Sequence, residues 1–204
     1  MKLQVTQENI SKALNTVARV ATGRSTLPIL SNILIKTINN RLSIAATNLD
    51  IAITHLVGAK ISKDGATTIP ARLMQDFVSS LPSGVIDIEL EENKLHITTD
   101  KYNSTINGTA ADEFPVMPAI KKGTSWSIPA KLLKTALQHV AIAASSDEAR
   151  PVLTGINIHT QNNKLYMVAT DSYRLAEKEI MKANTETKML VPASAAQDLL
   201  RIFG

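Results

Sequence analysis

The chain has 204 residues, of which 44% are hydrophobic and 20% charged, with no cysteine and a formal net charge of +4. This composition is typical of a globular protein with one large or two small domains, and it excludes disulfides and thiolate metal sites. The N-terminus has no apolar run like that of a signal peptide, and no stretch approaches about 20 uninterrupted apolar residues. The sequence therefore predicts a cytoplasmic protein with no membrane span.

The first elements in chain order are a strand over 3–6 and a helix. One side of the helix is apolar, because Ile10, Leu14, Val17 and Val20 recur at helical spacing. The other side carries Lys12, Asn15 and Arg19 and no acidic residue. Three strands follow, over 33–36, 41–46 and about 51–59, and Asn39-Asn40 is a turn pair that tolerates left-handed backbone.

A second helix is predicted to open at Pro70, since proline suits the first turn of a helix. Its apolar stripe is Met74, Phe77, Val78 and Leu81. Alternating strands come next, beginning with Ile86, Ile88 and Leu90 on one face. The predicted unit is thus a strand, a helix and three strands, followed by this second helix and its strands.

An internal repeat shows that this unit occurs twice. The segment 27–33 (LPILSNI) resembles 150–156 (RPVLTGI), and its prolines stand at positions 28 and 151, a separation of 123 residues. The same separation relates 39–42 (NNRL) to 162–165 (NNKL) and 46–47 (AT) to 169–170 (AT). A separation of 122 relates 70–71 (PA) to 192–193 (PA). The fold class expected is α+β, built from tandem domains.

The second unit is expected to start near Ser125. The apolar stripe of its first helix is Leu133, Leu137, Val140 and Ala144, with Lys131 and Lys134 towards the other side, and its second helix opens at Pro192. Gly204 corresponds to Pro82, which precedes three strands of the first unit. We therefore expect a first domain over 1–118 and a second over 124–204 that lacks its last strands, as in a fragment of a longer protein.

Catalytic signatures are missing from the sequence. There is no phosphate-binding glycine loop and no His-Glu-X-X-His pair, and the four histidines have no metal-ligand spacing. A hydrolase that uses Asp50 and Asp171 is an alternative. Both residues follow predicted strands, however, and a role as turn-forming aspartates explains them better. We predict a protein that is not an enzyme and has no metal or cofactor.

Two long stretches contain no acidic residue, between Glu8 and Asp50 and between Glu113 and Asp147. Each covers a predicted helix with basic residues on its polar side. Lysine and arginine bind backbone phosphates without reading sequence, and aromatic residues that could stack on bases make up only 3% of the chain. The pattern favours non-specific binding of double-stranded DNA, the alternative being chance clustering of charge on solvated faces.

Several motifs together resemble the beta sliding clamp of bacterial DNA polymerase III. They are 26–32 (TLPILSN), 46–50 (ATNLD), 66–72 (ATTIPAR), 114–115 (FP), 150–155 (RPVLTG) and 168–176 (VATDSYRLA). The resemblance implies a non-catalytic processivity factor with the DNA clamp fold. In that family, three similar domains form each chain and two chains close head to tail into a homodimer ring around DNA, so we expect these 204 residues to lack the third domain.

The resemblance also implies particular site residues. Arg24, Arg72 and Arg150 match family positions close to DNA, although Pro151 and Val152 stand where some members have paired aromatics. For Arg72, a solvated residue in the first helical turn is an equal alternative.

Peptides from the polymerase catalytic subunit and the clamp loader dock in a second-domain pocket in that family. The matching residues here are Leu153, Thr170, Tyr173, Arg174 and Leu175. The alternative is that Tyr173 and Leu175 pack beneath their loop. A runner-up function is a clamp-like module that binds a peptide but never encircles DNA.

Overall fold

The computed structural model describes residues 1–21, 27–117 and 125–202. The chain divides into two compact units, Met1–Pro118 and Ala119–Gly204, hereafter unit 1 and unit 2. Each unit is described by itself.

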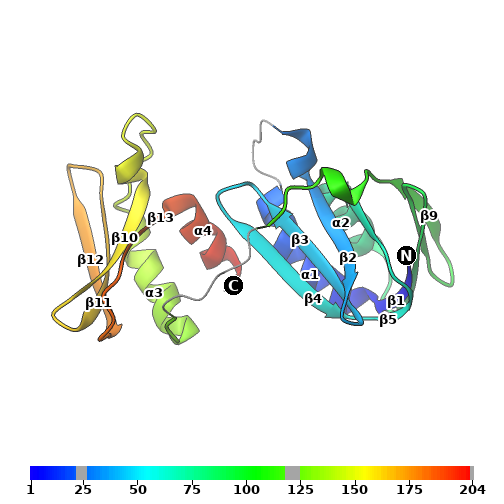
Figure 1. Ribbon diagram of the computed structural model, residues 1–204, viewed down its shortest axis with the longest axis horizontal. Helices are drawn as coiled ribbons and strands as arrows, with labels where there is room; N and C mark the ends of the chain where they lie inside the picture. Colours follow the sequence, from blue (N-terminus) through cyan, green and yellow to red (C-terminus); the bar gives the residue numbers. More distant parts are fainter. Residues whose placement is uncertain (22–26, 118–124, 203–204) are drawn as a thin grey trace. The chain divides into compact units, whose positions relative to one another are not determined.

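Unit 1 combines two antiparallel sheets with the helices α1 (Gln7–Ala21) and α2 (Ala71–Ser80) (Figure 1). One sheet has the strand order β5-β1-β7-β8-β9. Its strands are β5 (Lys60–Lys63), β1 (Lys2–Thr6), β7 (Val85–Glu91), β8 (Lys94–Thr98) and β9 (Asn103–Asn107). The other sheet has the order β4-β3-β2-β6. Its strands are β4 (Ala52–Gly58), β3 (Arg41–Thr47), β2 (Asn32–Ile38) and β6 (Ala66–Pro70).

The core of unit 1 lies between α1 and the two sheets. The apolar side chains of α1 are fully buried in it, as their helical spacing predicts, together with Ile33 and Ile44 from one sheet and Ile86 and Ile97 from the other. The turn between β2 and β3 also matches its prediction, since Asn39 and Asn40 have φ values of 47° and 58°.

The predicted order of one helix followed by three strands was incomplete. Two further strands, β5 and β6, precede α2; β5 pairs with β1 and β6 with β2. Both are short and rich in lysine or threonine, so no apolar alternation marks them, and pairing with distant strands stabilises them. Pro70 is consequently the last residue of β6 and the residue before α2, rather than part of the helix.

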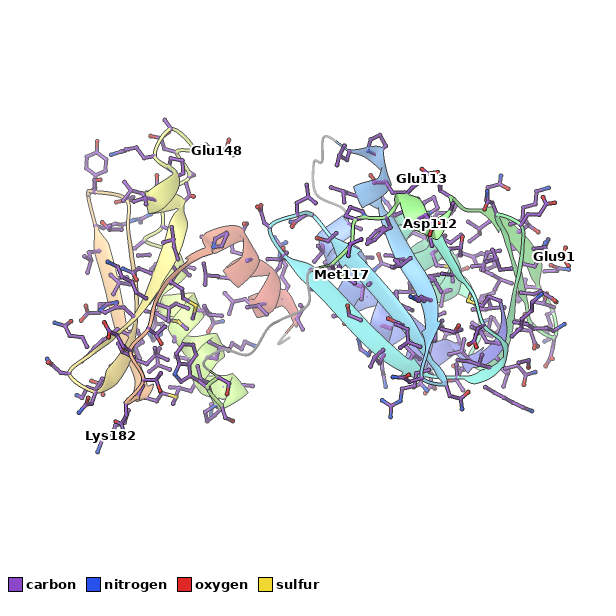
Figure 2. The ribbon with its side chains drawn as sticks, in the orientation of Figure 1. Glu91, Asp112, Glu113, Met117, Glu148 and Lys182 are labelled. Carbon is purple, nitrogen blue, oxygen red and sulfur yellow. The ribbon has the colours of Figure 1, made fainter. Side chains whose placement is uncertain are left out.

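A segment over 109–117, here called the crossing segment, traverses one face of the β4-β3-β2-β6 sheet. At one edge, the backbone of Thr109 exchanges two 2.9 Å hydrogen bonds with that of Thr68 on β6. At the other edge, Thr54 Oγ1 on β4 lies 3.8 Å from Met117 Sδ. Between them lies the short 3₁₀ helix η2 (Ala111–Glu113), where Figure 2 marks Asp112 and Glu113. Phe114 of this segment is buried.

Gly108 allows the crossing segment to approach β6 closely. A Cβ at this position would lie 2.6 Å from the Thr68 carbonyl oxygen and 2.8 Å from both Ile69 Cδ1 and Thr67 Oγ1. We expect Gly108→Ala to lower the free energy of unfolding by about 1–3 kcal/mol, because backbone must shift to admit the methyl group. The measurement is urea denaturation. The control is Gly58→Ala, whose Cβ would meet no atom within 4 Å; equal effects of both substitutions would contradict the account.

Unit 2 repeats one layer of unit 1. Its sheet has the order β12-β11-β10-β13, which corresponds strand by strand to β4-β3-β2-β6. The elements are β10 (Gly155–Gln161), β11 (Lys164–Thr170), β12 (Leu175–Lys182), β13 (Lys188–Pro192), α3 (Ala130–Ala141) and α4 (Ala193–Ile202). The register repeats as well, since Leu34 pairs with Thr68 and its counterpart Asn157 pairs with Leu190. Asn162 and Asn163 again have positive φ.

The strand expected at the start of unit 2 does not form. Residues 125–129 have no strand, whereas their counterpart β1 pairs with β5 and β7. In the part of unit 2 that the structure describes, neither pairing partner has a counterpart, and an unpaired strand has no acceptors for its backbone N–H groups. A hollow of about 190 Å³ remains between Trp126, Leu137 and Ile156. Among the described residues of unit 2, the core is therefore covered by a sheet on one side only.

Candidate nucleic-acid and peptide interfaces

The polar side of α1 is exposed and adjoins α2. Lys12, Asn15 and Arg19 are all exposed, opposite the buried stripe. The side-chain amide of Gln75 on α2 donates a 2.8 Å hydrogen bond to Asn15 Oδ1, so the polar rows of the two helices meet. Arg19 Nε donates to the Asn15 carbonyl oxygen at 3.0 Å. The two helices thus form one polar surface that carries predicted phosphate contacts.

Arg72 lies on the same helix as Gln75, one turn earlier, and is exposed. Its Nε is 3.8 Å from Asp76 Oδ2, and both side chains are largely solvated. Such an exposed ion pair contributes between about 0 and 1 kcal/mol, so it does little to prevent Arg72 from binding phosphate. Both predicted roles of Arg72, phosphate contact and solvated residue, fit this placement.

The basic residues predicted in unit 2 occupy separate places. On α3, Lys131 is exposed and Lys134 is half-buried. Arg150 lies after that helix, immediately before the 3₁₀ helix η3 (Pro151–Thr154). Arg24, the remaining predicted contact, belongs to unit 1 and is outside the described residues. Among the described residues, the predicted phosphate contacts therefore lie on α1, α2 and α3, with the exception of Arg150, which lies in a loop.

The β11–β12 hairpin has a fixed loop geometry. Thr170 Oγ1 donates to the Arg174 carbonyl oxygen at 2.6 Å, and Asp171 Oδ1 accepts from the backbone N–H groups of Tyr173 and Arg174 at 2.9 and 3.0 Å. Ser172 has a φ of 79°. The carboxylate of Asp171 therefore serves the turn, as its position after a strand predicted.

The β3–β4 hairpin of unit 1 repeats this geometry with other side chains. Thr47 Oγ1 donates to the Ile51 carbonyl oxygen at 2.8 Å, Asn48 Oδ1 accepts from Asp50 and Ile51, and Leu49 has a φ of 76°. The Tyr-Arg-Leu sequence is present only in the hairpin of unit 2. The shared backbone explains the repeat, while the differing side chains point to a role of unit 2 alone.

Backbone hydrogen bonds from Tyr173 and Arg174 hold the pKa of Asp171 below its usual value of 3.8. A carboxylate whose pKa is depressed by folding supports the folded loop above the unfolded value and loses that support as pH falls through the folded value. We expect the Tyr173 and Arg174 amide NMR signals to titrate together with a midpoint below 3.8, and Asp171→Asn to abolish this titration. A midpoint at or above 3.8 would contradict these contacts.

Tyr173 and Leu175 do not pack beneath the hairpin. Their exposed fractions are 92% and 65%, so the alternative prediction of a packing role is wrong. Val152 and Leu190 are further exposed apolar residues of unit 2. Val152 and Leu190 are neighbours, because both line the pocket described next, and exposed apolar surface of this kind is typical of protein-binding sites.

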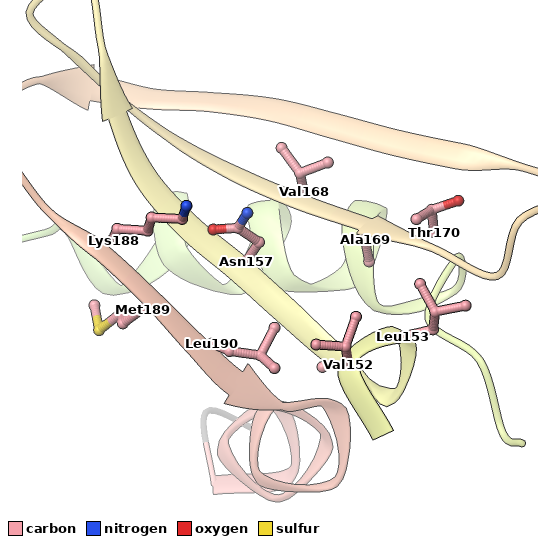
Figure 3. A pocket seen from close by; sticks show the side chains of 10 residues that line it. Val152, Leu153, Asn157, Val168, Ala169, Thr170, Lys188, Met189 and Leu190 are labelled. Atoms are coloured by element: carbon pink, nitrogen blue, oxygen red, sulfur yellow. The ribbon is translucent and has the colours of Figure 1, made fainter. Parts of the chain in front are cut away.

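A pocket of about 380 Å³ lies on the sheet face of unit 2 (Figure 3). Of the five residues predicted for a peptide pocket, Leu153 and Thr170 line it, whereas Tyr173, Arg174 and Leu175 are not among its lining residues. Its other walls include residues that sequence reasoning missed: Val152, Asn157, Val168, Lys188, Met189 and Leu190. Figure 3 shows Lys188 and Met189 at one end and Leu153 and Thr170 at the other. Strand alternation gave no signal for these residues, because the pocket is lined by consecutive residues of β11 and β13 and by Val152 of η3.

The repeat explains this pocket. At the matching positions of unit 1, Leu30 and Thr68 are 2% and 0% exposed, and the backbone of Thr68 pairs with Thr109 of the crossing segment. Their counterparts Leu153 and Leu190 are half-buried and 48% exposed. The pocket is therefore the counterpart of a face that unit 1 covers in part with the crossing segment, which carries Phe114.

No group of three or more histidine or acidic side chains in 1–21, 27–117 and 125–202 is placed to hold a metal ion. Asp50 and Asp171 belong to different units. None of the helices described is long and apolar enough to cross a bilayer.

Comparison with known proteins identifies the family. Residues 1–118 match the family model of the DNA polymerase III beta subunit, N-terminal domain, and residues 127–204 match that of its central domain. The chain belongs to the DNA polymerase III beta subunit family. The beta sliding clamp of Synechococcus elongatus is 33% identical over 100% of this chain and 56% of its own length.

Solved structures of this family share the fold. The Bacillus subtilis DNA polymerase sliding clamp superposes with a TM-score of 0.94 at 27% identity, over 99% of this chain and 56% of that one. The beta subunit of Bartonella birtlesii bound to griselimycin gives 0.93 at 31% identity, over 100% and 56%. The DNA clamp fold is thus confirmed, and the chain spans about half the length of the relatives it matches.

Proposed function

We propose that the protein is a DNA polymerase processivity factor that encircles duplex DNA as part of a homodimer ring. The observation that carries the proposal is the exposed polar surface of α1 and α2, with Lys12, Arg19 and Arg72, on a chain with the clamp fold. Contacts from Lys12, Arg19, Arg24, Arg72, Lys131, Lys134 and Arg150 to phosphates are weak and salt-dependent. A ring compensates for weak contacts by topology, so it stays on DNA and still slides.

The tethering function belongs to unit 2 in this proposal. Peptides of the polymerase catalytic subunit and the clamp loader would bind at Leu153, Thr170, Tyr173, Arg174 and Leu175. The support is the pocket beside Leu153 and Thr170 together with the exposed Tyr173 and Leu175. Griselimycin is bound by the relative from Bartonella birtlesii, and we propose that this protein also binds it.

The domain limits 1–118 and 124–204 are part of the proposal. Unit 2 would be completed in the native polypeptide by strands like β7, β8 and β9, followed by a third domain that closes the ring. The protein would act in the cytoplasm as a non-catalytic subunit of the polymerase holoenzyme.

Primer extension on a circular template tests the tethering function. With the native-length protein and its clamp loader present, the replicative polymerase should make products many times longer per binding event than without it. Products of unchanged length would overturn the proposal. Intact mass of the native protein supplies the companion result: a mass near 22 kDa would argue against a third domain, and about twice that would support it.

The clamp-like module that binds a peptide without encircling DNA is the second candidate. The exposed Tyr173 and Leu175 of unit 2 support this module as much as they support a clamp, because peptide binding there does not require DNA. Charge reversal on the basic helices, described below, separates the two.

A further inference from the structure

The side chain of Arg150 joins two loops of unit 2. Its Nε lies 3.5 Å from Asp147 Oδ2, and its Nη1 donates a 3.3 Å hydrogen bond to Ser172 Oγ. Ser172 is the residue of the β11–β12 hairpin with positive φ, directly before Tyr173. The guanidinium thus has its contacts within the protein, divided between the loop that precedes η3 and the hairpin loop.

The backbone of Arg150 is hydrogen-bonded to Leu153, a residue that lines the pocket. Its carbonyl oxygen accepts a 2.9 Å hydrogen bond from the N–H of Leu153, and its own N–H donates to the Asp147 carbonyl oxygen at 3.2 Å. The Leu153 carbonyl oxygen in turn accepts from the Ser145 N–H at 2.8 Å. Leu153 is therefore held by the same loop that carries Arg150.

We infer that Arg150 is a positioning residue of the peptide-binding site, holding the hairpin with Tyr173 at a fixed distance from the wall with Leu153. The inference rests on the proposed function of unit 2. Arginine suits this role because its planar fork contacts two partners at once, which a lysine ammonium cannot do in the same geometry. The phosphate contact assigned to Arg150 would compete with its bond to Ser172, so DNA binding at Arg150 would loosen the hairpin.

The test measures binding of griselimycin to the native-length protein by isothermal titration calorimetry. We expect Arg150→Lys and Ser172→Ala each to weaken binding roughly 3- to 10-fold, the usual range for losing one hydrogen bond. The double variant should weaken it no more than the stronger single one, because both remove the same contact. The control Lys164→Ala removes an exposed 2.8 Å ion pair with Glu179 elsewhere in unit 2 and should leave affinity unchanged.

A spectroscopic measurement separates positioning from general stability. In Arg150→Lys, the amide NMR signals of Ser172 and Tyr173 should shift while the melting temperature stays at the wild-type value. Additive effects of the two substitutions, or unchanged affinity in Arg150→Lys, would overturn the inference. Leu153→Ala tests the site itself: if it leaves griselimycin affinity unchanged, the proposed pocket is wrong, and that failure is distinct from a failure at Arg150.

Discussion

Reversing three charges, Lys12→Glu, Arg19→Glu and Lys134→Glu, should weaken binding to duplex DNA about 100-fold or more. Two of these residues lie on the exposed side of α1 and one on α3. Each lost phosphate contact removes roughly 0.9 from the slope of log affinity against log salt, so losing all three contacts lowers the magnitude of the slope by about 3. Fluorescence anisotropy with a labelled duplex over a range of salt concentrations measures both quantities.

A matched triple variant controls for net charge. Lys60→Glu, Lys63→Glu and Lys182→Glu change the charge equally, with two exposed residues on β5 of unit 1 and one on β12 of unit 2. Their DNA affinity should fall far less, because the substituted residues lie on strands away from the helix faces. Equal losses in both triple variants would mean that overall charge alone determines binding, and unchanged affinity in the first would favour the module that never encircles DNA.

Removing matching leucines from the two units should have unequal effects on stability. Leu14 on α1 is enclosed between two sheets, while its counterpart Leu137 on α3 borders the hollow of about 190 Å³. We expect Leu14→Ala to lower the free energy of unfolding by about 4 kcal/mol and Leu137→Ala by about 2 kcal/mol, because Leu137 has fewer packed neighbours to lose.

Urea denaturation can follow each unit separately. Trp126, the one tryptophan in the sequence, reports on unit 2 by fluorescence, and hydrogen exchange of β2 and β3 amides reports on unit 1. Leu73→Ala, at an exposed position of α2, is the control and should change stability by no more than about 0.5 kcal/mol. Equal losses for Leu14→Ala and Leu137→Ala would show that the core of unit 2 is as well covered as that of unit 1.

Much of the fold could be predicted because helical periodicity and the repeat are both local patterns. The apolar stripe of α1 and the asparagine turns at 39–40 and 162–163 are where the sequence indicates. The strands β5 and β6 could not be predicted, since their stability depends on pairing with β1 and β2. The strand expected near Ser125 does not form, because the described part of unit 2 has no strand with which it could pair.

The candidate sites were predictable to a different extent. Helix spacing placed Lys12 and Arg19 on the exposed side of α1, and the resemblance led to Leu153 and Thr170 in the pocket wall. The link from Gln75 to Asn15 and the contact of Arg150 with Ser172 were not predictable, because each joins residues far apart in sequence. Contacts of this kind depend on the tertiary fold.

Retention on circular DNA tests most directly the claim that the protein holds DNA by encircling it. The native-length protein is loaded by its clamp loader onto a nicked circular duplex, freed of unbound protein by gel filtration at high salt, and then treated with a restriction enzyme that cuts once. The account predicts that the protein stays with the circle and is lost within minutes after linearisation, since a ring slides off free ends. Equal retention on circular and linear DNA would contradict it.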